Sequence, residues 1–207
     1  AWTTALSGRS GPVVVALPEN MLRAASSRPP CGPVKVPEPA LSSAQITQLQ
    51  DYLRAAQRPV VLYGGSGWTV TAARQLETFA AANDVPLVAA FRYHDICDNH
   101  HPCFVGDAGV GMLGYIKTLL READMIVALN IRFGEMTTDG YDLFDLPKMA
   151  ATLIHSNVSD AELGKIYIAD LPLQAGPNAM AEALAGIRLE PNADRKAWCG
   201  AAKAAYD

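Results

Sequence analysis

Short apolar runs alternate with amphipathic segments along most of the chain. The runs have the length of strands and lie at residues 60–63, 86–90, 104–106, 125–129, 151–155 and 166–169. Apolar residues at helical spacing predict helices over residues 44–56, 69–82, 112–122, 178–185 and 193–205. Strands that are apolar throughout need helices on both faces, and parallel strands need crossover connections. The pattern therefore predicts an α/β fold, a doubly wound, six-stranded, mainly parallel sheet with helices on both faces.

The first 41 residues interrupt this alternation. Residues 1–7 look like the end of a helix, and the apolar residues 12–18 predict a short buried strand. Five prolines between residues 23 and 39 predict a semi-rigid linker, because proline fixes φ. A lone helix end and strand cannot bury themselves, so we expect a piece of something longer. The predicted division is residues 1–20 as the remnant of another domain, 21–41 as the linker and 42–207 as the main domain.

Charge and composition exclude several classes of function. The formal net charge is −4 and the 17 lysines and arginines are scattered, so no nucleic-acid partner is expected. The longest apolar run, residues 125–129, falls far short of the roughly 20 residues that a membrane span needs. No secretion signal opens the chain, and the four cysteines are mostly far apart, at Cys31, Cys97, Cys103 and Cys199. We therefore expect free thiols in a reducing cytoplasm.

The first candidate site is a glycine cluster that follows the strand at residues 60–63. In a parallel sheet such a turn lies at the carboxyl end of a strand, where backbone N–H groups and a helix start can receive an anion. Gly64, Gly65 and Ser66 can thus form a phosphate cradle. The dinucleotide fingerprint is incomplete, because Val70 stands where glycine or alanine is expected. The alternative is a tight turn that needs glycine only for a positive φ.

Arg132 is a second candidate, because it follows the strand at residues 125–129 and should lie at the same edge of the sheet. It could hold a phosphate. The alternative is a surface arginine paired with Glu135 or Asp139, which contributes little energy.

The sequence does not favour a metal site or a catalytic nucleophile. Residues 97–103 hold two cysteines and two histidines, but adjacent histidines rarely converge on one ion and no second pair exists elsewhere. An ordinary loop is preferred there. Ser66 lacks the Gly-x-Ser-x-Gly setting of a hydrolase, and His155 after its strand is more typical of a structural histidine than of a base. We expect no catalytic residue and no metal ligand.

Taken in order, several segments resemble thiamine-diphosphate enzymes of the acetolactate synthase and benzoylformate decarboxylase type. The sequence Gly-Arg-Ser-Gly-Pro-Val-Val-Val-Ala-Leu-Pro at residues 8–18 resembles the end of that family's N-terminal pyrimidine-binding domain. Landmarks similar to those of its central domain, a Rossmann-like fold that binds FAD in some members, follow at residues 58–67, 101–106, 122–129 and 162–165. The resemblance implies that residues 1–20 are a remnant of the N-terminal domain and that residues 42–207 are the central domain.

The resemblance also implies where the chemistry lies. In the family, thiamine diphosphate and Mg²⁺ sit between the N- and C-terminal domains, on an activating glutamate and a Gly-Asp-Gly…Asn motif. This chain has no Gly-Asp-Gly. We therefore expect a parent transferase or lyase that forms or cleaves carbon–carbon bonds at 2-oxo acids, with this chain not catalytic by itself. The implied partners are the other domains of the parent and further copies of it, in a dimer or tetramer.

In some family members the central domain holds FAD or ADP. The contacts carried over by motif are Gly64, Gly65, Ser66, Gly106, Arg132 and the loop after His155. Several residues depart from the FAD pattern, namely Asn130 for glycine, Gly134 and Glu135 for aspartates, Met136 for arginine and residues 156–159 for Ile-Asp-Ile-Asp. These departures argue against FAD. Two alternatives to a structural domain stay open: a stand-alone module that binds FAD, ADP or NAD, and an interaction domain with an empty crevice.

Overall fold

The computed structural model describes all residues from 1 to 207. Its six strands form one sheet in the order β3-β2-β1-β4-β5-β6, and every pair of neighbours is parallel. The strands are β1 (Pro59–Tyr63), β2 (Leu87–Ala90), β3 (Phe104–Ala108), β4 (Met125–Leu129), β5 (Thr152–Asn157) and β6 (Leu171–Gln174). The predicted doubly wound α/β fold is confirmed, with a sheet that is parallel throughout.

The five long helices begin and end within two residues of the predicted bounds. They are α3 (Ser43–Ala55), α4 (Val70–Asn83), α5 (Gly114–Glu122), α6 (Pro177–Ala185) and α7 (Ala193–Tyr206). Local capping explains two of the starts. Ser42 and Gln45 form a reciprocal capping box at α3, and the Thr69 hydroxyl accepts the N–H of Ala72 at α4. No helix combines the length and the hydropathy of a membrane span.

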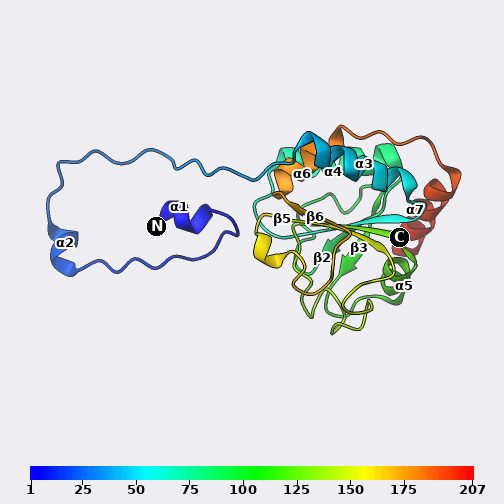
Figure 1. The fold of residues 1–207 in the computed structure, drawn as a ribbon. Helices are drawn as coiled ribbons and strands as arrows, with labels where there is room; N and C mark the ends of the chain where they lie inside the picture. The colour runs from blue at the N-terminus through cyan, green and yellow to red at the C-terminus, as the bar shows by residue number, and fades with distance from the viewer.

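Helices cover both faces of the sheet, as predicted. Helices α3, α4 and α6 lie together on one face (Figure 1), where their apolar residues pack on alternate side chains of the strands. The other face carries α5 and the long segment between β4 and β5. Helix α7 packs beside the edge strand β3, where the rings of Tyr206 and Phe104 meet edge to face at 5.3 Å. Each strand of the sheet centre is therefore buried on both sides.

The sixth strand is displaced from its predicted place. The prediction chose the apolar run at residues 166–169, whereas β6 is Leu171–Gln174. Leu171 and Leu173 are buried while Pro172 and Gln174 are exposed, so this edge strand alternates instead of being apolar throughout. Pro172 is tolerated because an edge strand needs fewer N–H donors. Tyr167 packs on Phe133 and Phe144 outside the sheet.

The predicted strand at residues 12–18 is also wrong for this structure. The first 35 residues form an extended excursion (Figure 1) that touches the domain around Arg9 and contains only two short helices, α1 (Trp2–Leu6) and α2 (Glu19–Arg23). Residues 12–18 have no neighbouring strand, because all six strands of the sheet come from the main domain. Val14 remains 93% exposed. An apolar strand sequence without a partner strand does not form a ladder.

Candidate functional site

The candidate site is a crevice at the carboxyl ends of the strands. The chain builds β1, β2 and β3 toward one side and β4, β5 and β6 toward the other, so strand order reverses between β1 and β4. Open α/β sheets bind ligands at such a switch point. A cavity of about 860 Å³ lies there, lined by the segments after β1, β2, β4 and β5 and by two pieces of the N-terminal region. Its volume would admit a nucleotide-sized molecule.

The loop after β1 needs its glycines for their positive φ angles and because the backbone of Asn130 approaches it closely. Gly65 has φ +71° and Gly67 has φ +92°, both in the left-handed region. A Cβ atom on Gly65 would lie 2.2 Å from the carbonyl oxygen of Asn130. The carbonyl oxygen of Gly64 accepts a hydrogen bond from Trp68 Nε1 at 2.8 Å. The loop is therefore a tight turn whose carbonyl groups face the protein.

Asn130 fills the switch point between β1 and β4. It follows β4 with φ +53°, a conformation that asparagine tolerates better than most residues. Its side-chain Nδ2 donates to the carbonyl oxygen of Ser66 at 2.8 Å and, more weakly, to that of Gly64 at 3.4 Å. The residue is 6% exposed. It thus joins the two loops that a ligand would have to separate.

Asn178 bonds to two backbone groups next to the start of α4, the N–H of Thr69 and the carbonyl oxygen of Gly67. Its Oδ1 accepts the backbone N–H and the hydroxyl of Thr69, each at 2.9 Å, and its Nδ2 donates to the carbonyl oxygen of Gly67 at 2.9 Å. The helix start, which would otherwise receive an anion, is capped by the protein itself.

Arg132 projects into solvent at the crevice and makes no ion pair. The alternative, a pair with Glu135 or Asp139, does not form, and Asp139 lies 2.5 Å from Lys117 Nζ instead. Arg92 also lines the cavity and stacks on the ring of Phe91, with its guanidinium carbon 4.9 Å from the ring centre. The crevice mouth therefore carries two arginines that form no ion pair.

Gly106 lies apart from the other predicted contacts. It sits inside β3, two strands away from the switch point, and does not line the cavity. Its φ is +116°, and a Cβ atom there would lie 2.7 Å from the hydroxyl of Tyr115. That hydroxyl donates to the carbonyl oxygen of Val105 at 3.0 Å. Gly106 thus lets α5 pack closely on the edge of the sheet.

Residues 97–103 form a loop that packs on the sheet through its cysteines. Cys97 and Cys103 are buried, His100 is exposed, and His101 Nδ1 accepts the backbone N–H of Cys103 at 3.2 Å. No group of three or more His, Cys, Asp or Glu side chains converges in a way that could hold a metal ion.

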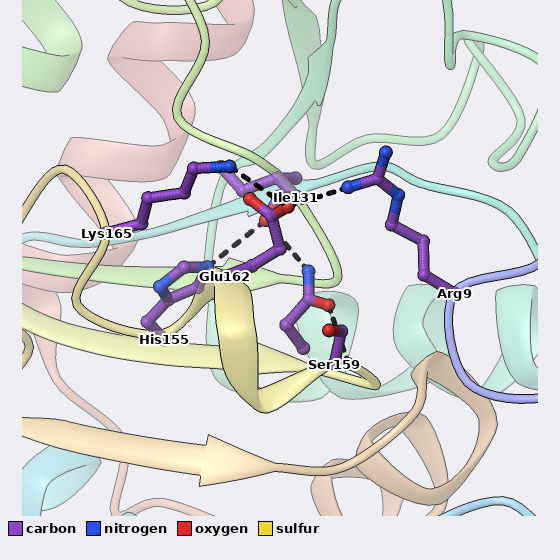
Figure 2. Close-up of polar contacts among 7 residues, drawn as sticks. Arg9, Ile131, His155, Ser159, Glu162 and Lys165 are labelled. Atoms are coloured by element: carbon purple, nitrogen blue, oxygen red, sulfur yellow. Dashed lines mark hydrogen bonds and ion pairs between the residues drawn. The ribbon is translucent and has the colours of Figure 1, made fainter.

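His155 is a buried residue that lies inside β5, and not after its strand as predicted. Its Nε2 lies 3.1 Å from the carbonyl oxygen of Ile131 (Figure 2), and its ring meets Phe133 edge to face at 5.1 Å. Nδ1 has no partner in the protein. Burial lowers the pKa of His155, because the charged imidazolium would lose its hydration.

We expect this buried imidazole to make stability fall in acid. The unfolded histidine takes up a proton near pH 6.5 and the folded one resists it, so stability is lost as the pH falls below about 6.5. Each proton taken up only on unfolding steepens the loss by up to about 1.4 kcal/mol per pH unit. Urea unfolding at pH 7.5, 6.5 and 5.5 should show a smaller loss in His155→Phe, because phenylalanine takes up no proton on unfolding. The carbonyl oxygen of Ile131 stays paired in this variant, since Asn157 Nδ2 donates to it at 3.1 Å.

His100→Gln is the matched control, since His100 is exposed. That variant should keep the full pH dependence of the wild type. An unchanged pH dependence in His155→Phe would contradict the assignment.

Glu162 is a site residue whose role the sequence did not reveal. Its side chain is 7% exposed and lies between Arg9 Nη1 at 2.7 Å and Lys165 Nζ at 3.5 Å (Figure 2). Arg9 comes from the N-terminal segment, 153 residues earlier in the chain. A buried carboxylate needs such partners, because its hydration is lost. No local pattern signals a pair with this separation.

Comparison with known proteins gives the family. The family model described as "Thiamine pyrophosphate enzyme, central domain" matches residues 46–184, which is more than half of the chain. The chain belongs to this family. The resemblance seen in the sequence landmarks is confirmed.

The relatives of this central domain are acetolactate synthases. Acetolactate synthase isozyme 2 large subunit of Escherichia coli is 27% identical over 184 residues, which cover 89% of this chain and 33% of the relative. Isozyme 3 large subunit of the same organism is 30% identical over 179 residues, covering 84% and 31%. The large subunit of Parasynechococcus marenigrum is 27% identical over 207 residues, covering 96% and 33%. The chain thus spans about a third of the length of these relatives.

Side chains of this central domain bridge the loops at the switch point of its crevice. The carbonyl groups of the glycine loop bond to Trp68, Asn130 and Asn178, and the start of α4 is capped by Asn178. The N–H groups of Gly65 and Ser66 make no hydrogen bond within the protein, so the loop keeps donors that a phosphate could use. The sequence already marked Asn130 as a departure from the FAD pattern, because it stands in the place of a glycine. The structure adds Asn178, which no motif singled out.

Proposed function

We propose that this chain is the central, mainly structural domain of a thiamine-diphosphate-dependent enzyme related to acetolactate synthase. The parent forms or cleaves carbon–carbon bonds at 2-oxo acids, with the cofactor as electron sink. The central domain spaces the catalytic domains and supports subunit packing, and it contributes no catalytic residue. The family match and the acetolactate synthase relatives support this proposal.

The observation that carries the structural role is how the polar side chains at the carboxyl edge of the sheet are hydrogen-bonded. Parallel sheets place reactive groups at this edge. Here Asn130 and Asn157 bond to backbone groups of neighbouring loops, and His155 bonds through Nε2 to the carbonyl oxygen of Ile131. Nδ1 of His155 has no partner, but this residue is buried and does not line the cavity. Buried groups held in this way favour a structural role.

The exposed apolar side chains of the N-terminal segment support the proposal that this chain has binding partners in the parent enzyme. Trp2, Val14, Leu17 and Leu22 are each at least 60% exposed, although such side chains are normally covered. We propose that the preceding domain covers them, and that the parent assembles with further copies of itself. All four cysteines are free, which supports a reducing, cytoplasmic setting.

Calorimetry with thiamine diphosphate and Mg²⁺ tests this proposal on the 207-residue chain. We expect no binding heat at millimolar cofactor, because the proposed role leaves the cofactor to other domains. The full-length parent is the positive control. Micromolar binding by the 207-residue chain would contradict a purely structural role.

A second candidate function is nucleotide binding, which the two unpaired cations at the crevice mouth favour. Arg92 and Arg132 line a cavity of about 860 Å³, and neither forms an ion pair. In the same calorimetric series, FAD, ADP or NAD would then bind, and Arg132→Ala would weaken binding about tenfold or more. Arg54→Ala, an exposed arginine paired with Asp51, is the control. Flat titrations with all three nucleotides would favour an interaction domain with an empty crevice.

A further inference from the structure

Three of the four thiols of this chain gather in one part of the core. Cys97, Cys103 and Cys199 are each 5% exposed and belong to the same apolar cluster, whereas Cys31 is exposed in the N-terminal region. All four are free thiols. The proposed structural role of the domain makes no use of them. Buried cysteines are ordinarily inert, so a pair of thiols in contact, with an imidazole beside it, is unusual.

Cys103 lies directly before strand β3, at the end of the surface loop that begins at Cys97. Its backbone is fixed on both sides, because its N–H donates to His101 Nδ1 at 3.2 Å and its carbonyl oxygen accepts the N–H of Leu87 at 2.7 Å. Its neighbours His101 and Pro102 are half-buried and exposed, so Cys103 lies just below the surface. A small solute reaches its sulfur through a local movement of this loop.

Cys199 lies on the face of α7 that packs against the sheet. Arg195 is one turn before it and Tyr206 two turns after it on the same face. Arg195 Nε donates to the carbonyl oxygen of Asn83 at 2.7 Å, and the Tyr206 ring meets that of Phe104 at 5.3 Å. Phe104 is the first residue of β3. The two contacts hold Cys199 beside the start of that strand.

A hydrogen bond between their side chains pairs Cys103 with Cys199, and His101 forms a second one with Cys103. The bond with Cys199 lowers the pKa of the Cys103 thiol, burial opposes this change, and the bond with His101 lowers the pKa further. The bond with Cys103 raises the pKa of His101 and, together with burial, that of Cys199. Cys103 is therefore the thiol that loses its proton first, and Cys199 keeps its proton beside it.

We propose that Cys103 and Cys199 form a reversible redox site, in which peroxide oxidises the two thiols to a disulfide that ties α7 to the start of β3. This goes beyond the proposed structural role, because it assigns a modification site that responds to oxidants. The free thiols are the reduced form of the site. A low-pKa thiol next to a resolving thiol is the usual arrangement of redox-sensing cysteines, and intracellular disulfides of this kind are transient.

The oxidation balances with hydrogen peroxide as the only co-reactant. The Cys103 thiolate attacks one peroxide oxygen, the O–O bond breaks, and the products are a sulfenic acid and hydroxide, which takes up the proton that Cys103 lost. The Cys199 sulfur then attacks the Cys103 sulfur, so that an S–S bond forms and the S–O bond breaks. The oxygen leaves as water with the thiol proton of Cys199. Two thiols and one peroxide thus give one disulfide and two waters, and a dithiol reductant reverses the change by thiol exchange.

Peptide mapping of the oxidised 207-residue chain tests the assignment. The folded protein is treated with hydrogen peroxide, the remaining thiols are blocked with N-ethylmaleimide, and the chain is cut before aspartate without reduction. This cleavage places Cys97, Cys103 and Cys199 in separate peptides, residues 95–97, 98–106 and 194–206. We expect mass spectrometry to find peptide 98–106 linked to peptide 194–206, and dithiothreitol to separate them.

Variants separate this pair from the other thiols. Cys103→Ala and Cys199→Ala should each abolish the cross-link. Cys97→Ala is the matched control and should leave it unchanged, because Cys97 lies in the same loop at the same 5% exposure while burial raises the pKa of its thiol to about 12. Cys31→Ser removes the exposed thiol that would otherwise link two chains, and the cross-link should persist in it. Circular dichroism checks that each variant keeps the fold.

The oxidised wild-type chain should also melt about 5–15 °C higher than the reduced chain, because a disulfide across a long loop restricts the unfolded state. Dithiothreitol should restore the lower melting temperature. An oxidised chain that melts no higher would overturn the proposal, since the bond would then not close within the native fold.

The mapping of the folded wild type is decisive by itself and does not depend on how any variant folds. A cross-link through peptide 95–97, or peptides 98–106 and 194–206 that stay separate after peroxide treatment, would equally overturn the assignment.

Discussion

Replacing Gly65 with alanine is expected to lower the free energy of unfolding by about 2–5 kcal/mol. An alanine at φ +71° costs about 1–2 kcal/mol, and its Cβ would lie 2.2 Å from the backbone oxygen of Asn130 and 2.5 Å from its Nδ2. Such overpacking typically adds about 1–3 kcal/mol. Urea unfolding followed by circular dichroism measures the loss.

Gly67→Ala separates the two causes. Gly67 also has a positive φ, +92°, but the nearest atom to its Cβ position is 3.9 Å away. This variant should show the conformational cost alone, about 1–2 kcal/mol. Equal losses in the two variants would show that the close approach of the loops after β1 and β4 is absent in solution. The switch point would then be open.

Replacing Asn83 with alanine is expected to cost about 2–5 kcal/mol and to loosen the C-terminal helix. Asn83 is 1% exposed at the end of α4. Its Oδ1 accepts the N–H of Leu189 at 2.8 Å, and its Nδ2 donates to the carbonyl oxygens of Phe79 at 2.8 Å and Ile187 at 3.2 Å. Removing the amide leaves buried groups unpaired, each at about 1–3 kcal/mol.

The Asn83 variant should also raise amide hydrogen exchange in α7. The backbone carbonyl oxygen of Asn83, which the substitution keeps, accepts Arg195 Nε at 2.7 Å and ties that helix to α4. Loss of the side-chain anchors frees this backbone to shift and so weakens the tie. Asn192→Ala is the control, because Asn192 caps α7 through the N–H groups of Asp194 and Arg195 near the surface. Loss of one cap costs about 1 kcal/mol. A loss in the Asn83 variant no larger than this would show that its buried network contributes little.

The accuracy of the strand predictions depended on how fully each strand is buried and on whether it has a partner strand. Strand β4, Met125–Leu129, was predicted at its observed bounds, because a strand buried on both faces is apolar at every position. Strand β6 was misplaced by five residues, because an edge strand buried on one face carries only Leu171 and Leu173 as apolar signals. Residues 12–18 have a strong strand pattern but no partner strand in this chain.

The candidate site was predictable only in part. The position of Gly64, Gly65, Ser66 and Arg132 at one edge follows from strand order, since carboxyl ends of parallel strands meet there. Gly106 was placed with them by motif, yet β3 lies two strands away from the switch point. Glu38 and Asn178, 140 residues apart, carried no sequence signal, because each looks like an ordinary polar residue until the folded chain brings them together.

The sequence by itself determined the family, the fold class and the tight turn after β1, because these depend on periodicity, glycine placement and the order of landmarks along the chain. Only the tertiary structure decided what fills the crevice. Asn130 meets Ser66, Asn178 meets Glu38 and Glu162 meets Arg9 across separations of 64, 140 and 153 residues. Contacts of this range are set by how the elements pack, which no local pattern encodes.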